Sequence, residues 1–151
     1  MQYQPETHPL NAAVAEGELV GCEWVIDAFE CDPGRLCELF TLQQLCDEII
    51  SSLQLNVVRE PMWYQFPGPA GVTGLYLLSE SHFACHTYPE YRLATFNLYC
   101  CRDIPAWPWS DRLAQQLFAG RVEVIKLARG RLEGFIQKTT EVMTTVKGGH
   151  S

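Results

Sequence analysis

The chain has 151 residues, of which 47% are hydrophobic and 19% charged, so it is long enough for one globular domain and too apolar for a disordered protein. Its formal net charge of −7 argues against a nucleic-acid-binding surface, because phosphate contacts require clustered Lys and Arg. No stretch of the sequence approaches the roughly 20 consecutive apolar residues that span a bilayer.

The cysteines do not form the pattern of a disulfide framework. There are seven, which is an odd number, and residues 1–17 lack the basic start and apolar stretch of a secretory signal. We therefore expect a reducing, cytosolic location, in which most thiols behave as small buried hydrophobes. Residues 1–17 themselves are polar and acidic, and we expect them to be a flexible leader.

The first half of the chain predicts two strands around one helix. A dense apolar run predicts a strand over 18–30, and Asp32-Pro33-Gly34 predicts a turn after it. Thr41 and Gln44 have the spacing of a capping box and predict a helix start. A second strand is expected over 56–66, before the loop at 67–71. The apolar stripe that predicts the helix consists of Leu42, Leu45, Cys46, Ile49, Ile50 and Leu53.

The second half predicts mostly strands. Ser110 is expected to cap a second helix that ends at Gly120, and the segment 140–151 is expected to be a flexible tail. Residues 18–139 are thus predicted to form one α+β domain, a two-layer sandwich of a mostly antiparallel sheet covered by helices. The strands are expected over 72–79, 82–88, 93–101 and 122–127, with a turn at Pro89-Glu90.

The segment around Ser81 concentrates reactive side chains between two apolar strands. A carboxylate, a hydroxyl, two imidazoles and a thiol fall within seven residues, from Glu80 to His86. Buried polar groups without partners cost free energy, so a cluster of this kind requires an explanation.

Strand periodicity separates the two neighbouring cysteines. Alternate residues of a strand face opposite sides, so Cys100 shares the apolar face with Phe96 and Leu98. Cys101 shares the more polar face with Asn97, which makes it the cysteine that is available for chemistry.

The residue types by themselves leave three interpretations open. The cluster can consist of satisfied core and edge residues of a binding domain. It can be a zinc site of His82, Cys85 and His86 with Cys100 or Cys101, although this spacing matches no common zinc pattern. It can also be a Cys–His nucleophile pair for acyl transfer.

A long motif favours a fourth interpretation. A Glu-Ser-His followed by His-Thr-aromatic-Pro-Glu is highly specific and resembles the bacterial and archaeal S-adenosylmethionine decarboxylases. The similarity covers most of the chain, from Trp24 to about Cys101. The matching segments are Trp24-Val25-Ile26-Asp27, Cys31-Asp32-Pro33, Gly71-Val72-Thr73-Gly74, Glu80-Ser81-His82 and His86-Thr87-Tyr88-Pro89-Glu90, followed by Cys101.

The resemblance implies that the chain makes its own cofactor. In this family the serine hydroxyl attacks the carbonyl of the preceding glutamate, and elimination from the resulting ester leads to a pyruvoyl group. Carried over to this sequence, the cut falls between Glu80 and Ser81. It would yield a β chain of residues 1–80 and an α chain of residues 81–151 that begins with the pyruvoyl group.

The resemblance also assigns further roles. Thr73 matches the hydroxyl that assists processing, and His86 matches the base that removes the Cα proton of Ser81. The substrate amine would form a Schiff base with the pyruvoyl group, which accepts the electrons left by carbon dioxide. Cys101 matches the donor that then protonates the substrate carbon. The candidates for substrate binding are Phe66, Tyr88, Glu90 and Asn97, with Phe66 and Tyr88 stacking on adenine.

The implied activity is decarboxylation of S-adenosylmethionine, whose product is the aminopropyl donor for spermidine synthesis. The family pattern implies a homodimer of αβ units whose active sites draw on both protomers, with no metal, nucleic acid or membrane involved.

The sequence departs from the family pattern at four positions, namely Thr73 for serine, Tyr88 for tryptophan, Asn97 for aspartate and Arg102 for glycine. The last two make the site more positive, although the parent substrate is a sulfonium cation. Two alternatives therefore stay open: a diverged L-ornithine or L-arginine decarboxylase with the same self-processing, and an unprocessed regulatory paralogue.

Overall fold

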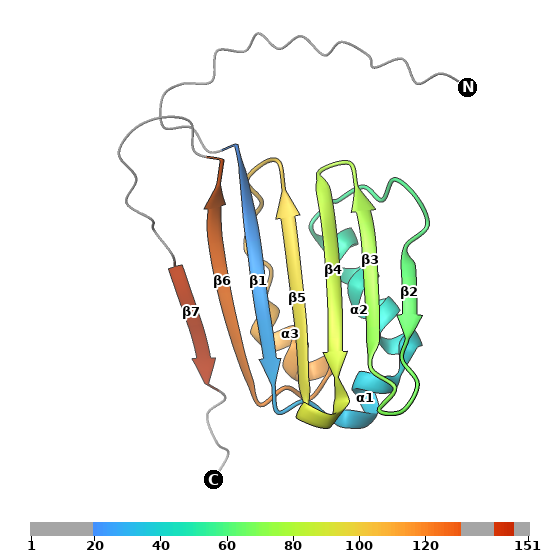
Figure 1. Cartoon of the computed structure of the whole chain (residues 1–151). Coiled ribbons are helices and arrows are strands. Elements are labelled where there is room, and N and C mark those ends of the chain that lie inside the picture. The colour runs from blue at the N-terminus through green and yellow to red at the C-terminus, as the bar shows by residue number, and fades with distance from the viewer. Residues whose placement is uncertain (1–19, 131–140, 147–151) are drawn as a thin grey trace, which may run out of the picture.

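The computed structural model describes residues 20–130 and 141–146, and Figure 1 shows their arrangement. Seven strands form one antiparallel sheet in the order β2-β3-β4-β5-β1-β6-β7. The strands are β1 (Gly21–Phe29), β2 (Met62–Gln65), β3 (Val72–Leu78), β4 (Ser81–Tyr88), β5 (Leu93–Cys100), β6 (Arg121–Arg129) and β7 (Glu141–Val146). The helices are α1 (Pro33–Cys37), α2 (Leu39–Ser52) and α3 (Trp109–Gln116), with a 3-10 turn, η1 (Pro89–Tyr91).

The helices pack on one face of the sheet (Figure 1). The strands alternate between buried and half-buried residues, so every second side chain, such as Ile26, Phe83 and Leu98, enters the core. From α2, Leu42, Leu45 and Ile49 face the same core. The predicted α+β two-layer architecture is confirmed.

The opposite face of the sheet is not covered by any described helix (Figure 1). Large apolar side chains nevertheless lie on it, along β2 and β3. The exposed fraction is 69% for Met62, 57% for Tyr64, 43% for Leu75 and 54% for Leu77. We call this surface, together with the outward-facing residues of β4 and β5, the open face.

Both predicted helix starts were wrong. Thr41 does not cap the first long helix, because its hydroxyl donates to the Glu38 carboxylate, and the helix already begins at Leu39. The expected turn after β1 is the short helix α1, for which the Asp32 carboxylate accepts a hydrogen bond from the Arg35 main-chain N–H at 2.9 Å.

The second helix also differs from its prediction. It begins at Trp109 after Pro108, with no side-chain cap, and it ends at Gln116, several residues before Gly120. Pro108 costs the helix no hydrogen bond, because a main-chain N–H at the start of a helix has no partner within it.

The observed strand bounds differ from the predicted ones by one to three residues in most places, and by more at the second strand and the tail. Of the strand expected over 56–66, only 62–65 is a strand, and Val57 forms a single bridge with Leu78. Strand β4 already begins at Ser81. The expectation of a flexible tail over 140–151 is wrong for 141–146, where β-branched residues pair with β6 and cover its edge. The expected leader, 1–17, lies outside the described residues.

Among the described residues, no helix is both long and apolar enough to cross a membrane.

Candidate active site

Most of the residues predicted for the site lie near the two ends of strand β4. Ser81 begins the strand beside the end of β5, where its register partner is Cys100. His86 lies near the other end, opposite Thr73 of β3 and Thr95 of β5. In Figure 1 the first of these ends is at the top of the sheet and the second at the bottom.

The lower end contains a hydrogen-bonded pair surrounded by aromatic rings. The Thr73 hydroxyl lies 2.6 Å from His86 Nδ1. The Phe66 and Tyr88 rings lie 5.5 Å and 4.3 Å from the imidazole, measured between ring centroids. Tyr64 in turn contacts Phe66 edge to face at 4.7 Å. The structure therefore brings together four of the predicted residues on the open face: Thr73, His86, Phe66 and Tyr88.

The upper end contains the Glu80–Ser81 peptide. The Glu80 carbonyl oxygen accepts a hydrogen bond from the Cys101 main-chain N–H at 2.8 Å. The Ser81 hydroxyl lies 3.0 Å from Nδ1 of His82. This end therefore combines a hydroxyl, a nearby imidazole nitrogen and a carbonyl whose oxygen is held by an N–H group.

Ser81 has an unusual backbone conformation. Its φ is 145°, whereas the other non-glycine residues with positive φ in the described part of the chain lie between 54° and 59°. The latter values belong to the left-handed region that turns adopt, but 145° is sparsely populated by residues with a side chain. A conformation of this kind costs of order 1–3 kcal/mol and tends to occur at functional sites.

The Glu80 side chain is buried and anchored. Its carboxylate accepts hydrogen bonds from the Asn56 main-chain N–H at 3.1 Å and from Asn56 Nδ2 at 2.7 Å. The Arg102 guanidinium lies 3.9 Å from the same carboxylate. Burial raises the pKa of the Glu80 carboxyl, but hydrogen bonds to the carboxylate, first those from Asn56 and then those from Glu80's own N–H and Ser79, together hold this pKa below its usual value.

The two neighbouring cysteines differ as strand periodicity predicts. Cys100 is fully buried on the helix-covered face, and burial raises the pKa of its thiol to about 12. Cys101 follows the last residue of β5 and is exposed. Cys100 is thus a neutral core residue, whereas Cys101 is accessible to a small molecule.

One chain does not bring the two ends together. His86 follows Ser81 by five residues along β4, which at about 3.3 Å per residue separates them by about 16 Å. Thr73 pairs with His86 and is equally remote, since Leu78 is the β3 partner of Ser81. Neither side chain can reach the Glu80–Ser81 bond of its own chain.

Glu90 and Asn97 are in neither cluster. Glu90 is exposed in the turn η1, beyond the end of β4. Asn97 lies in the middle of β5, between Ala84 of β4 and Val25 of β1, on the open face.

Comparison with known proteins identifies the family. The family model described as S-adenosylmethionine decarboxylase matches residues 22–130. The chain belongs to the S-adenosylmethionine decarboxylase family. This confirms the resemblance that the Glu-Ser-His motif indicates, and with it the prediction of a decarboxylase fold and enzyme class.

Individual members of the family agree. The chain is 31% identical over 115 residues to a protein of Thermotoga petrophila named S-adenosylmethionine decarboxylase proenzyme, covering 76% of this chain and 87% of the relative. It is 37% identical over 114 residues to the proenzyme of Bacillus velezensis, covering 75% and 88%. The crystal structure of the Aquifex aeolicus adenosylmethionine decarboxylase superposes with a TM-score of 0.64 at 27% identity, covering 82% of this chain and 100% of that one.

The zinc alternative is not supported in this family member. His82 and His86 lie on the open face but four residues apart along one strand, about 13 Å. Cys85 faces the other side, where its sulfur lies 3.8 Å from that of Cys46 in the core. No three potential ligands of the His, Cys, Asp or Glu type gather anywhere in the described ranges.

Part of the family motif has a structural purpose that the sequence did not reveal. Thr87 is buried, and its hydroxyl donates to the Leu36 carbonyl at 2.8 Å and accepts from the Val72 N–H at 2.9 Å. It therefore ties α1 to β3 and β4. Asn56 was also missed, because an isolated asparagine in a loop carries no sequence signal.

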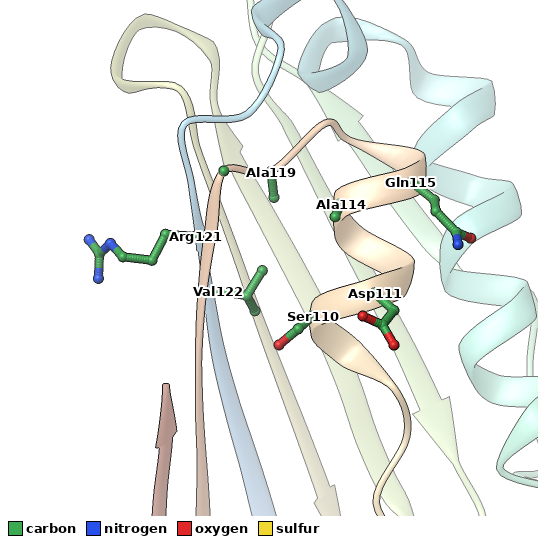
Figure 2. A pocket seen from close by; sticks show the side chains of 8 residues that line it. Ser110, Asp111, Ala114, Gln115, Ala119, Arg121 and Val122 are labelled. Carbon is green, nitrogen blue, oxygen red and sulfur yellow. The ribbon is translucent and has the colours of Figure 1, made fainter. Parts of the chain in front are cut away.

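A cavity of about 360 Å³ between α3 and β6 lies apart from these residues (Figure 2). Its walls include Ser110 and Asp111 of α3, with Val122 of β6. None of the described residues that line this cavity was predicted for the site.

Proposed function

We propose that this protein is a pyruvoyl-dependent S-adenosylmethionine decarboxylase that forms its cofactor by cutting itself between Glu80 and Ser81. The observation that carries the proposal is the Glu80–Ser81 peptide itself. Ser81 has a φ of 145°, and the carbonyl oxygen of Glu80 is held at 2.8 Å by the Cys101 N–H. A strained serine directly after a carbonyl with a fixed donor is the arrangement that an intramolecular acyl shift requires.

The cut proceeds by transfer of the Glu80 acyl group from nitrogen to oxygen. The Ser81 hydroxyl adds to the Glu80 carbonyl carbon, its proton passes to the departing amide nitrogen, and the C–N bond breaks to leave an ester. Negative charge develops on the carbonyl oxygen, where the Cys101 N–H stabilises it. A base then removes the Cα proton of Ser81, and the carboxylate of Glu80 leaves.

The remaining dehydroalanine reacts with one water and loses ammonia, which leaves the pyruvoyl group on the chain 81–151. The pyruvoyl group supplies a carbonyl that holds the substrate amine and accepts the electrons of the breaking C–C bond. Glu80 becomes the last residue of the chain 1–80.

A second copy of the chain supplies the base. His86 and Thr73 are about 16 Å from their own Ser81, so they act on Ser81 of a partner. The open face carries Met62, Tyr64 and Leu75 exposed next to this pair, and exposed apolar surface of this kind marks an interface. When the open faces of two copies meet with their strands running in opposite directions, the His86 end of β4 in each copy lies against the Ser81 end of β4 in the other.

The remaining assignments follow from this shared site. Phe66 and Tyr88 flank His86 and offer flat surfaces for adenine, and Cys101 is the exposed group that returns a proton to the substrate carbon. Glu90 and Asn97 remain candidates for polar contacts to the substrate. We further propose a cytosolic protein whose product serves spermidine synthesis.

The Arg102 charge bears on the choice of substrate. Its guanidinium lies 3.9 Å from the Glu80 carboxylate. The negative charge of this carboxylate partly compensates the positive charge that Arg102 adds relative to the glycine of the family pattern. A sulfonium substrate is therefore compatible with Arg102. The alternative, a decarboxylase of L-ornithine or L-arginine, uses the same self-processing and is tested in the same assay.

An intact-mass spectrum of the purified protein tests the cut. Two fragments divided after residue 80, with a pyruvoyl mass at the new N-terminus, support the proposal. A single 17.1 kDa chain under all conditions would refute it and favour an unprocessed paralogue. Carbon dioxide release from S-adenosylmethionine, ornithine and arginine, measured side by side, then identifies the substrate, and turnover of an amino acid alone would exclude S-adenosylmethionine.

A further inference from the structure

The loop that follows α2 runs alongside the predicted cut. The Val58 N–H donates to the Leu77 carbonyl at 2.9 Å, and Val57 forms a bridge with Leu78. One residue earlier, the Asn56 carbonyl accepts from the Ser79 N–H at 2.9 Å. This loop therefore acts as a short extra strand that reaches the turn between β3 and β4.

At that turn, Asn56 binds Glu80 with two further hydrogen bonds. Asn56 Nδ2 donates to Oε1 at 2.7 Å and the Asn56 N–H donates to Oε2 at 3.1 Å, so each carboxylate oxygen has its own donor. The Glu80 residue is only 7% exposed, and it is one of two polar residues among the buried ones in the described part of the chain, with Thr87 the other. A two-point contact to a carboxylate fixes its orientation as well as its position.

We propose that Asn56 is a positioning residue for self-cleavage, which holds Glu80 so that its carbonyl carbon stays within reach of the Ser81 hydroxyl. This inference rests on the proposed function and deepens it. Three hydrogen-bonded groups hold the chain around the scissile bond. Asn56 binds the Glu80 carboxylate and its carbonyl accepts from the Ser79 N–H, while the Glu80 carbonyl oxygen accepts from the Cys101 N–H. Between them the peptide cannot relax away from the attacking hydroxyl.

The contact also persists after the cut. Cleavage converts the main-chain carbonyl of Glu80 to a carboxylate but leaves its side chain unchanged. Asn56 belongs to the same fragment, 1–80, and keeps the new C-terminus at the edge of the site. Asn56 acts through Glu80, whose position it fixes before the cut. It does not contact the reacting atoms itself.

The test is a time course of cleavage in a cell-free translation reaction, followed on denaturing gels after synthesis is stopped. We expect Asn56→Ala to cut about ten- to a hundredfold more slowly than the wild type, since a misplacement of about 1 Å costs on the order of a hundredfold in rate. Arg59→Ala is the matched control, because Arg59 is exposed in the same loop, and it should cut at the wild-type rate. A wild-type rate for Asn56→Ala would overturn the inference.

A swapped pair separates positioning from general loss of structure. Asn56→Asp places two carboxylates together and should cut more slowly than Asn56→Ala. Combining Asn56→Asp with Glu80→Gln restores an amide–carboxylate pair with the roles reversed, and should cut at least tenfold faster than Asn56→Asp alone. If the double variant is no faster, Asn56 is only structural and the inference is wrong. If the wild type itself is never cut, the proposed function fails instead.

Discussion

The Thr73 hydroxyl and Nδ1 of His86 lie 2.6 Å apart on neighbouring strands, whereas both are about 16 Å from Ser81 of the same chain. The proposed cut assigns His86 as the base at Ser81, and over this distance only a second copy can supply His86. The proposed mechanism therefore requires a dimer.

Complementation between two inactive variants tests the shared site. Neither Ser81→Ala nor His86→Ala should cut alone. When both are co-expressed, a mixed dimer contains one complete site, in which His86 of the Ser81→Ala chain faces Ser81 of the His86→Ala chain. Differently tagged chains resolved on a gel should show fragments of the His86→Ala chain only. Failure of any cut in the mixture would contradict the exchange of residues between protomers.

The Thr73 hydroxyl, as the partner of His86, should be needed for the cut. Thr73→Val keeps the shape of the side chain but removes the hydrogen bond that orients His86, and we expect cleavage to slow by about 10²-fold, the cost of a small misplacement of a reacting group. Thr73→Ser restores the hydroxyl and should cut at a rate close to the wild type. Equal cleavage of the valine variant, measured by the same gel time course, would remove Thr73 from the mechanism.

Cys101 should matter for turnover more than for the cut. Cys101→Ala keeps the main-chain N–H that holds the Glu80 oxygen, so the chain should still be cleaved. Decarboxylation should fall by about 10²–10⁴-fold, the range for loss of a general acid. Cys100→Ala is the control: it leaves kcat in place and lowers only the unfolding temperature, because Cys100 is buried. Full activity of cleaved Cys101→Ala would show that another group donates the proton.

The Asn56–Glu80 contact should make stability depend on pH in the acid range. The pKa of Glu80 is lower in the folded chain, so its carboxylate stabilises the fold above its usual pKa of about 4.3. This contribution is lost as the pH falls through the lower folded value. In the uncut Ser81→Ala background, Glu80→Gln should therefore flatten the fall in unfolding temperature between about pH 4.5 and pH 3. An unchanged slope would mean that Glu80 is not held as its contacts indicate.

Much of this protein can be read from its sequence. The alternation of apolar and polar residues in 93–100 predicts which side of that strand enters the core, because side chains of a strand alternate strictly. The same regularity separates Cys100 from Cys101. Glu80, Ser81 and the residues after them form a motif long enough to identify the family.

Helix starts were less predictable, because several residues can serve as a cap and the tertiary contacts choose among them. Thr41 has capping-box spacing, yet its hydroxyl is used by Glu38 and the chain turns into the helix earlier. The short helix α1 depends on the contact of Asp32 with Arg35 and on Thr87, which holds the Leu36 carbonyl from a distant strand.

The sequence by itself determined the family, the layers of the fold and the bond that is proposed to break, because these depend on local periodicity and on a contiguous motif. Only the tertiary structure decided that Asn56 lies against Glu80 and that His86 lies far from Ser81. The Asn56–Glu80 contact joins the loop after α2 to the turn between β3 and β4, 24 residues later in the chain. The distance between His86 and Ser81 follows from the extended length of β4. Neither leaves a pattern in the order of the residues.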